Sequence, residues 1–329
     1  MKTLVARLDN DGDVLLAGPA IRAASAAGDV VVLCGPNGER AASLLPGVDR
    51  VVRWHCPWIA HPAGEFSPAE VESLVPVLAG LEVEVALVLT SFHQSPLPLA
   101  LLLKLAGVPK VVARSTDYAG ALLDVRLRDD PDVPEAERAL SVARAAGFEL
   151  PPGDDGRLRV DAPEPHLPGP YVVLHPGATA PARTWSPDRC ARAVTALAEA
   201  GHRVLVTGGP GETALTARVA GEHGVDLGGR TTFAELAGVL RGADAVVVGN
   251  TGPAHLAVAV GTPVVSLFAP VVPAVRWAPH GTHVLLGDQH APCRDTRARE
   301  CPVPGHPCLD DVTPAAVVAA VAELTGVRA

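Results

Sequence analysis

The sequence predicts an α/β protein built from two doubly wound, Rossmann-like domains. Short valine-rich apolar segments alternate with alanine- and leucine-rich helical segments, the alternation stops once near mid-chain, and it then resumes. Continuous apolar strands of this kind are typical of parallel sheets covered by helices on both faces. With 329 residues, 48% of them hydrophobic, the chain is long enough for two self-sufficient cores.

In the first half, the pattern predicts five strands and three helices. The expected strands are Thr3–Leu8, Val30–Cys34, Arg50–Arg53, Val85–Leu89 and Lys110–Ala113, and the expected helices are Val14–Ala26, Leu97–Leu105 and Glu135–Ala145. Between Leu150 and Pro170 nine proline or glycine residues interrupt the pattern, which is typical of a linker. We therefore expect an N-terminal domain over residues 1–155, a linker over 156–170 and a C-terminal domain over 171–329.

The second half repeats the alternation. The expected strands are Tyr171–His175, Arg203–Thr207, Ala245–Val248, Pro263–Phe268 and His283–Leu286, and the expected helices are Pro187–Ala200, Thr213–Ala220, Phe233–Leu240, Ala254–Val260 and Pro314–Leu324. The two domains are expected to face each other across a central cleft. Because open α/β sheets bind ligands beyond the carboxyl ends of their strands, the loops that directly follow strands are the first candidates for a site.

Composition excludes several other classes of protein. The 36 acidic and 27 basic residues give a net charge of -9, and no basic run is present, so a nucleic-acid partner is not expected. The longest apolar stretch, Leu97 to Val108, contains Pro98 and Lys104 and is too short for a transmembrane span. The apolar run at the N-terminus is also too short for a signal peptide. We expect a cytoplasmic protein whose six cysteines stay reduced.

The loop Asp9–Asp13 follows the first strand and precedes a helix. A carboxylate there has the chemistry of a general base, but Asp is also a favoured helix cap, and acidic groups stabilise a helix start. Local sequence leaves both interpretations open.

In the C-terminal domain, three further loops follow strands. His175–Thr179, with Arg183 soon after, offers small residues and a cation to a phosphate, although Ser186 before Pro187 also explains the loop as a turn and cap. Gly208–Glu212 suits phosphate or ribose, but lacks the spacing of a P-loop or a G-x-G-x-x-G motif. Neither an ATPase nor an ordinary dehydrogenase is therefore indicated.

The last of these loops, Gly249–His255, places Asn250 or Thr251 as cap of the following helix, whose free N–H groups suit a diphosphate. A lone histidine such as His255 is more often a structural hydrogen-bonding residue than a catalyst. Near the C-terminus, Cys293, Cys301 and Cys308 are spaced more widely than the cysteines of zinc fingers or ribbons, so no metal site is expected there.

Taken together, these loops resemble glycosyltransferase family 9, best known for ADP-heptose lipopolysaccharide heptosyltransferases. The matching segments are Leu4–Leu16, His175–Ala178, Arg183–Pro187, Thr251–Leu256 and Gly261–Pro270, in the family's order, and the three-cysteine tail also looks similar. The resemblance implies a GT-B fold, with the acceptor bound by the N-terminal domain and an ADP-sugar donor by the C-terminal one. It also implies an inverting transfer, most simply of a heptose, that requires no metal or other cofactor.

The resemblance assigns roles residue by residue. Asp13 falls on the position of the base that deprotonates the acceptor hydroxyl. The residues that fall on donor-binding positions are Thr179, Arg183, Glu212, Asn250, Thr251, Gly252 and His255. Asn10 and His93 lie in loops expected to meet the acceptor, although a structural role for His93 is equally compatible with the sequence.

At one position of the donor motif the sequence departs from the family, because Asn250 stands where the family usually has Asp. An amide both donates and accepts hydrogen bonds, whereas a carboxylate only accepts them, so the identity of the donor sugar stays open.

The charge distribution bears on the acceptor. Residues 1–150 carry a net charge of -6, a poor match for an anionic lipid. We therefore expect a soluble amino-sugar or aminocyclitol acceptor over a lipopolysaccharide core. The alternatives are a nucleotide-sugar epimerase of the same fold and a non-catalytic nucleotide-sugar-binding protein.

Overall fold

The computed structural model describes residues 1–60, 65–128, 131–165 and 167–326. The chain forms two compact units, Met1–Asp161 and Ala162–Ala329, and each is described by itself. The division falls within the proline- and glycine-rich segment 156–170, of which residue 166 lies outside the described residues, as do residues 327–329 of the expected C-terminal domain.

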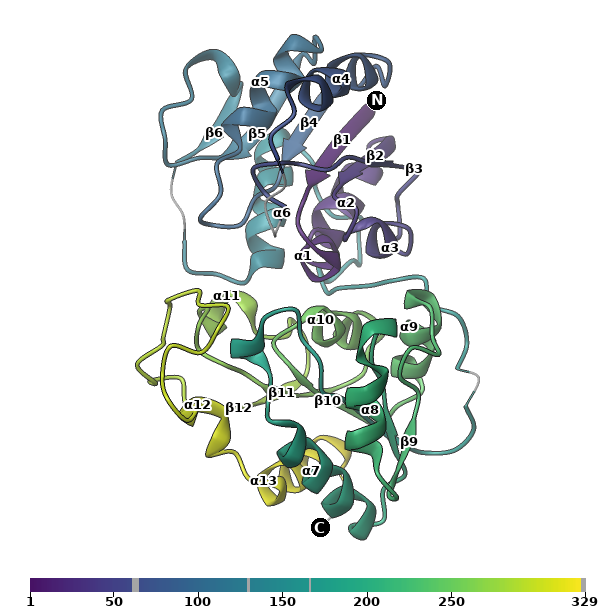
Figure 1. The fold of residues 1–329 in the computed structure, drawn as a ribbon. Coiled ribbons are helices and arrows are strands. Elements are labelled where there is room, and N and C mark those ends of the chain that lie inside the picture. Colours follow the sequence, from purple (N-terminus) through teal and green to yellow (C-terminus); the bar gives the residue numbers. More distant parts are fainter. Residues whose placement is uncertain (61–64, 129–130, 166, 327–329) are drawn as a thin grey trace. The chain divides into compact units, whose positions relative to one another are not determined.

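Unit 1 is a six-stranded parallel sheet in the order β3-β2-β1-β4-β5-β6 (Figure 1). The strands are β1 Lys2–Arg7, β2 Asp29–Cys34, β3 Arg50–Arg53, β4 Val85–Val88, β5 Lys110–Arg114 and β6 Val125–Leu127. The chain leaves β1 in one direction and returns to its other side as β4, which makes the junction of β1 and β4 the switch point of a Rossmann-like sheet.

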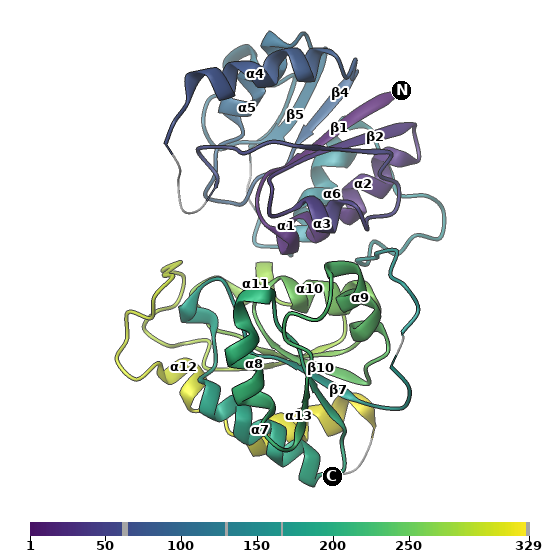
Figure 2. The same ribbon diagram turned by 45° about the vertical axis from the view of Figure 1, so that its right-hand side comes forward.

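Helices cover both faces of this sheet (Figure 2). The helices are α1 Asp11–Leu16, α2 Gly18–Ser25, α3 Glu39–Ala42, α4 Pro68–Ala79, α5 Leu97–Leu105 and α6 Glu135–Ala146, with a 3₁₀ turn η1 at Gly120–Leu122. α4 and α5 pack on one face, and α2 packs against α6 on the other. Leu4 and Ala6 of β1 join the core cluster that contains Leu74 of α4 and Leu103 of α5. Since side chains alternate along a strand, Arg7 points to the opposite face, toward α6.

Unit 2 repeats this topology, with the strand order β12-β11-β10-β7-β8-β9 and its switch point between β7 and β10 (Figure 1). The strands are β7 Val172–His175, β8 Val204–Val206, β9 Gly224–Asp226, β10 Ala245–Gly249, β11 Val264–Leu267 and β12 His283–Leu286. The helices are α7 Pro187–Glu199, α8 Thr213–Ala220, α9 Phe233–Arg241, α10 Gly252–Ala259, α11 Ala274–Trp277, α12 Pro307–Asp310 and α13 Pro314–Thr325, with 3₁₀ turns η2 Pro181–Arg183 and η3 Pro210–Glu212.

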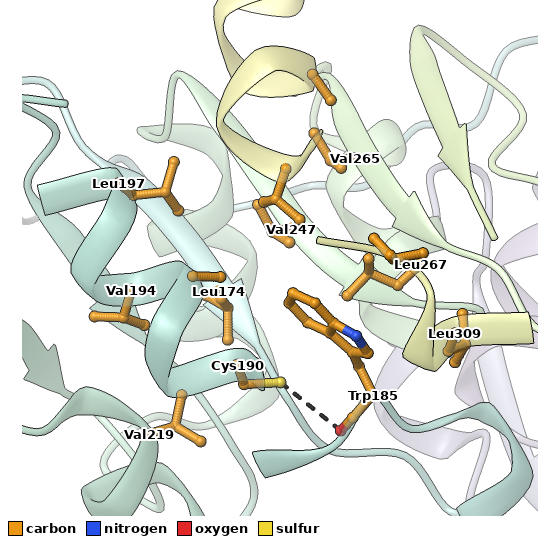
Figure 3. Close-up of a cluster of buried hydrophobic side chains, with 14 of the residues drawn as sticks. Leu174, Trp185, Cys190, Val194, Leu197, Val219, Val247, Val265, Leu267 and Leu309 are labelled. Carbon is orange, nitrogen blue, oxygen red and sulfur yellow. Dashed lines mark hydrogen bonds between the residues drawn. The ribbon is translucent and has the colours of Figure 1, made fainter. Parts of the chain in front are cut away.

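The core of unit 2 lies between its sheet and the helices α7 and α13. Figure 3 shows Trp185 among aliphatic side chains of β7, β10 and β11, with the Cys190 Sγ donating to the Trp185 carbonyl at 3.8 Å. Ser186 caps α7 by accepting from the Arg189 N–H at 3.3 Å, as its place before Pro187 predicts. This core fixes the segment that carries Arg183.

The two doubly wound domains predicted from the sequence are confirmed, and the element boundaries differ in a few places. The single helix expected over Val14–Ala26 is two helices, α1 and α2, because Pro19 lacks the N–H that a continuous helix would need there. α10 begins at Gly252, two residues before the expected start. Sequence periodicity also missed α4 and the short strands β6 and β9. Among the described residues, no helix is both long and apolar enough to span a membrane.

Candidate active site

In unit 1, a buried arginine lies at the carboxyl end of β1, at the switch point. The Arg7 side chain is 4% exposed, and its guanidinium contacts three carboxylates. Nε is 2.9 Å from Asp9 Oδ2, Nη2 is 3.0 Å from Asp13 Oδ1 and Nη1 is 3.8 Å from Glu135 Oε2. Nη2 also donates to Ser91 Oγ at 2.8 Å, beyond the end of β4. The guanidinium thus joins β1, its following loop, the loop after β4 and α6.

The charges around Arg7 keep it protonated. Burial lowers the pKa of this guanidinium, but Asp9, Asp13 and Glu135 more than offset that effect, so the pKa is raised above its ordinary value. Glu135 in turn lies 3.7 Å from Nη1 of Arg138, which donates to the Thr90 carbonyl. The cluster therefore holds three carboxylates and two guanidinium groups.

Asp13, the predicted base, lies in the first turn of α1. Its side chain is 18% exposed, one oxygen faces Arg7, and the other accepts from the Asn10 backbone N–H at 3.4 Å. Asp13 therefore does cap the start of α1, as one of the two interpretations predicted. Its carboxylate nevertheless remains partly exposed. A partly exposed carboxylate at a switch point is placed to take a proton from a bound ligand.

The other two acidic residues of the loop have different environments. Asp9 accepts from Gln94 Nε2 and faces Arg7. Burial raises its pKa, with Asp13 adding to the effect and Arg7 opposing it. Asp11 is held by Arg40 and by the Ala41 N–H at 3.2 Å, so it ties α1 to α3. Its burial likewise raises its pKa.

The two residues expected to meet the acceptor lie near this cluster. Asn10 is exposed, and its Oδ1 accepts from Asn37 Nδ2 at 3.4 Å. His93 is exposed in the loop after β4, with its ring edge-on to Phe92 at 5.3 Å between centroids. The charge of His93 lowers the pKa of Asp9 slightly, whereas burial raises that pKa by more.

In unit 2, the loops after β7 and β8 touch each other through Glu212. A Cβ built on Gly177 would fall 1.9 Å from Glu212 Oε1, so this carboxylate lies directly against the backbone of the β7 loop. Glu212 Oε2 accepts from the Gly209 N–H at 2.7 Å. His175 Nδ1 lies 2.9 Å from Thr207 Oγ1, and burial lowers the pKa of this imidazole although Glu212 opposes the shift. Glu212 therefore contacts the loop after β7 at Gly177 and the loop after β8 at Gly209.

Thr179 and Arg183 lie on the segment between β7 and α7. Thr179 is exposed, and its carbonyl accepts from Arg299 Nη2 at 2.7 Å. Arg183 ends the η2 turn, and its carbonyl packs against Gly249 at the end of β10. The charge of Arg183 also reaches His255 on α10. The fold therefore brings Arg183 to the start of α10, as the predicted donor site requires.

Asn250 and His255 are buried polar groups beside this helix start. Asn250 is 5% exposed, and its Nδ2 donates to the Ala269 carbonyl at 3.3 Å, whereas its Oδ1 has no hydrogen-bond partner among the described residues. His255 Nδ1 is likewise without one in the described part of the chain. Burial, with smaller effects of His280 and Arg183, lowers the His255 pKa to about 4, so the ring is neutral at pH 7.

Thr251 is the N-cap of α10, and Gly252 is its first residue. The Thr251 side chain makes no capping hydrogen bond. Pro253 has no N–H and the Ala254 N–H donates to the Thr251 carbonyl at 3.0 Å, so among the described residues the open backbone donor at this helix start is the Gly252 N–H. The switch point of unit 2 therefore combines a helix N-terminus, the nearby Arg183, and the buried atoms Asn250 Oδ1 and His255 Nδ1, which have no hydrogen-bond partner in the described part of the chain. These groups suit the binding of a diphosphate and a polar sugar.

The three C-terminal cysteines lie together in the core of unit 2. The Cys308 thiol interacts with Cys293 and Cys301, and burial raises its pKa to about 12. Cys301 Sγ donates to the Val303 carbonyl at 3.3 Å. In the described ranges, no three His, Cys, Asp or Glu side chains are grouped to hold a metal ion.

Two Rossmann-like units, each with polar groups gathered at its switch point, define a two-domain α/β protein of the GT-B class. The family model for glycosyltransferase family 9 (heptosyltransferase) matches residues 93–305, more than half of the chain. The chain therefore belongs to glycosyltransferase family 9, as its motifs indicated.

Similar proteins support this membership. The chain is 28% identical over 169 residues to lipopolysaccharide heptosyltransferase 3 of Escherichia coli, an alignment that covers 48% of this chain and 49% of that protein. The chain thus spans about half the length of the curated relatives that it matches. The structure of E. coli ADP-heptose lipopolysaccharide heptosyltransferase II superposes with a TM-score of 0.75 at 20% identity, over 99% and 98% of the two chains. A family 9 glycosyltransferase from Veillonella parvula gives 0.78 at 14%, over 98% and 97%. These two structures confirm the GT-B fold.

Sequence reasoning missed the centre of the unit 1 cluster. Arg7, Glu135, Ser91 and Gln94 were not singled out from the sequence. A usable signal was present, because an arginine that ends a buried strand and precedes an acidic loop requires buried counter-charges.

Proposed function

We propose that the protein is an inverting glycosyltransferase that moves a heptose from an ADP-sugar to an acceptor hydroxyl without a metal ion. Family membership supports sugar transfer, and the observation that carries the proposal is the Asp13 carboxylate, partly exposed at the switch point of unit 1. The name of the similar E. coli enzyme, an ADP-heptose heptosyltransferase, motivates the choice of donor.

In the proposed reaction, the acceptor oxygen forms a bond to the anomeric carbon while the bond from that carbon to the diphosphate breaks. Asp13 takes the proton of the acceptor hydroxyl, and ADP leaves with the electron pair. The N-terminal end of α10, with the Gly252 N–H, and the Arg183 guanidinium stabilise the negative charge that develops on the diphosphate. Asn250 Oδ1 and His255 Nδ1 supply polar atoms for the sugar and the diphosphate, and Thr179, Glu212, Thr251 and Gly252 complete the donor site.

For the acceptor, we propose a neutral or cationic small molecule such as an amino-sugar or aminocyclitol. The three carboxylates and two guanidinium groups of the unit 1 cluster favour a positively charged group over a phosphate. Arg22 and Arg40, the next two cations along the chain, are paired with Asp154 and Asp11. The name of the E. coli relative makes a lipopolysaccharide core the competing acceptor.

The test measures ADP release from ADP-heptose with two sets of acceptors, aminocyclitols and a lipid A–inner core fragment. Asp13→Asn is expected to lower turnover by roughly 10²- to 10⁴-fold, since it removes general-base catalysis. It should leave unchanged the thermal shift that ADP-heptose produces. Asp11→Asn is the matched control, because this neighbouring carboxylate is engaged by Arg40 and Ala41.

Each alternative outcome has its own meaning. Conversion of the donor without any acceptor would favour an epimerase, and binding without turnover would favour a nucleotide-sugar-binding protein. A larger thermal shift with UDP- or GDP-sugars than with ADP-heptose would overturn the proposed donor. Loss of activity in EDTA, restored by a divalent ion, would overturn the metal-free mechanism.

A further inference from the structure

The Arg7 guanidinium is the shared partner of the acidic groups at the unit 1 switch point. Its three nitrogens lie 2.9 Å from Asp9, 3.0 Å from Asp13 and 3.8 Å from Glu135. Asp9 and Glu135 are nearly or fully buried, with side chains 10% and 1% exposed, whereas Asp13 is the most exposed of the three at 18%. Asp9 and Glu135 thus contact the arginine on its buried side, and Asp13 contacts it on the side that is open to solvent.

This arrangement fixes the place of the Asp13 carboxylate. An arginine this deeply buried is costly unless its charge is balanced. Here Nη2 donates to Asp13 Oδ1 and Ser91 Oγ, while Asp9 and Glu135 balance the charge at Nε and Nη1 without a hydrogen bond of good geometry at Nε. The guanidinium is planar and rigid, so an oxygen bound to Nη2 is held in direction as well as distance. Asp13 is also tied to the Asn10 N–H at 3.4 Å.

We propose that Arg7 is a positioning residue that orients the Asp13 carboxylate and offsets the mutual repulsion of Asp13 and Asp9. The inference rests on the proposed function, in which Asp13 is the base. It explains why the strand that leads into the site ends in a buried cation: without one, three neighbouring carboxylates would repel each other and take up protons.

The charged and polar groups of the cluster around Arg7 and Asp13 come from four elements. Arg7 lies on β1, Asp9 and Asn10 lie in the loop after it, Ser91, His93 and Gln94 follow β4, and Glu135 and Arg138 lie on α6. Removing a cation from this set and removing an anion must shift the midpoint of the remaining carboxylates in opposite directions. A role of Arg7 in packing alone predicts no such opposition.

The experiment follows the side-chain carboxyl carbons of the full chain, labelled with ¹³C-aspartate, through a pH titration by NMR. The Asp13 and Asp9 signals are assigned from Asp13→Asn and Asp9→Asn. In Arg7→Met, the Asp13 midpoint should rise by about one pH unit or more, as expected when an adjacent guanidinium is removed. In Asp13→Asn, the Asp9 midpoint should fall, because a neighbouring negative charge is lost. Arg7→Lys keeps the charge and should stay close to the wild type.

Arg22→Met is the matched control, since Arg22 is a second buried arginine of unit 1 and pairs with Asp154 at 2.6 Å. It should leave the Asp13 midpoint unchanged. If Arg7→Met does not fold, the turnover of Arg7→Lys decides the question, and a wild-type turnover number would overturn the proposal. An Asp13 midpoint in Arg7→Met that stays at the wild-type value, or that moves downward, would also overturn it.

Kinetics separate this inference from the proposed function. Arg7→Lys loses the planar fork, so it should lower the turnover number for ADP release several-fold while the thermal shift given by ADP-heptose stays at the wild-type value. If Asp13→Asn retains turnover, the proposed base is wrong, whereas the NMR titration still measures the coupling of Arg7 to Asp13. If Asp13→Asn is inactive and the titrations do not move, only the role of Arg7 is wrong.

Discussion

A Cβ atom on Gly249 would fall 2.7 Å from the backbone carbonyl oxygen of Arg183, so the end of β10 and the η2 turn are in direct contact. A backbone atom cannot rotate away as the end of a long side chain can. Gly249→Ala is therefore expected to push the Arg183 turn outward and to lower the free energy of unfolding by about 1–3 kcal/mol. Urea unfolding measures the loss of stability, and a smaller thermal shift with ADP-heptose reports the displaced Arg183 turn.

Gly211→Ala is the control for this change. A Cβ at position 211, in the adjacent η3 turn, meets no heavy atom within 4 Å. The free energy of unfolding should stay within about 0.5 kcal/mol of the wild type, and the donor-induced shift should not change. Equal behaviour of the two alanine variants would show that the Gly249–Arg183 contact does not constrain the donor site.

Asn250→Asp tests the departure from the family at the β10 end. The Asn250 Nδ2 donates to the Ala269 carbonyl at 3.3 Å, and the side chain is buried. A carboxylate cannot donate, so two oxygens would face each other in a buried place, and the free energy of unfolding at pH 7 should fall by about 1–3 kcal/mol. The same exchange at exposed Asn37 should cost far less. An aspartate variant as stable as the wild type would mean that another group compensates the charge.

The sequence predicted both sheets because their strands are short, valine-rich and buried on both faces. The same rule placed the Asp9–Asp13 loop and the Asn250–His255 segment at the carboxyl ends of strands, where the structure has them. It missed β9, whose segment Gly224–Asp226 lies at a sheet edge and has the half-buried Gly224 and an exposed Val225 instead of an apolar run.

Local sequence patterns could not predict which residues surround Arg7. Glu135 belongs to α6, far along the chain from Arg7, and only tertiary packing brings the two together. For the same reason, sequence could not separate the roles of three carboxylates in one loop. Their difference comes from Arg40 and Ala41 at Asp11, Gln94 at Asp9, and partial exposure at Asp13.

Cysteine reactivity follows from burial. The pKa of the Cys190 thiol is raised to about 12 by burial, and its Sγ donates to the Trp185 carbonyl (Figure 3). The thiolate is the reactive form, so iodoacetamide at pH 8 should label Cys190 at least tenfold more slowly than the half-buried Cys301. Peptide mass spectrometry over time gives both rates. In 6 M urea they should converge, and equal labelling of the folded protein would contradict the prediction.

The ion pair between Arg22 and Asp154 makes the free energy of unfolding depend on pH in the acid range. Asp154 accepts from Arg22 Nε at 2.6 Å and Nη2 at 3.0 Å, and these bonds are the main reason that its pKa is lowered to about 2. An unfolded aspartate has a pKa of about 3.9, so the stabilisation is complete above about pH 5 and is lost as the pH falls through 2. Asp154→Asn should therefore lower the free energy of unfolding by about 2 kcal/mol at pH 7, and the difference from wild type should shrink toward pH 2. Asp155→Asn, at the exposed neighbouring carboxylate, should show little loss. A difference for Asp154→Asn that stays constant from pH 7 to pH 2, in urea titrations at each pH, would show that the ion pair is not its source.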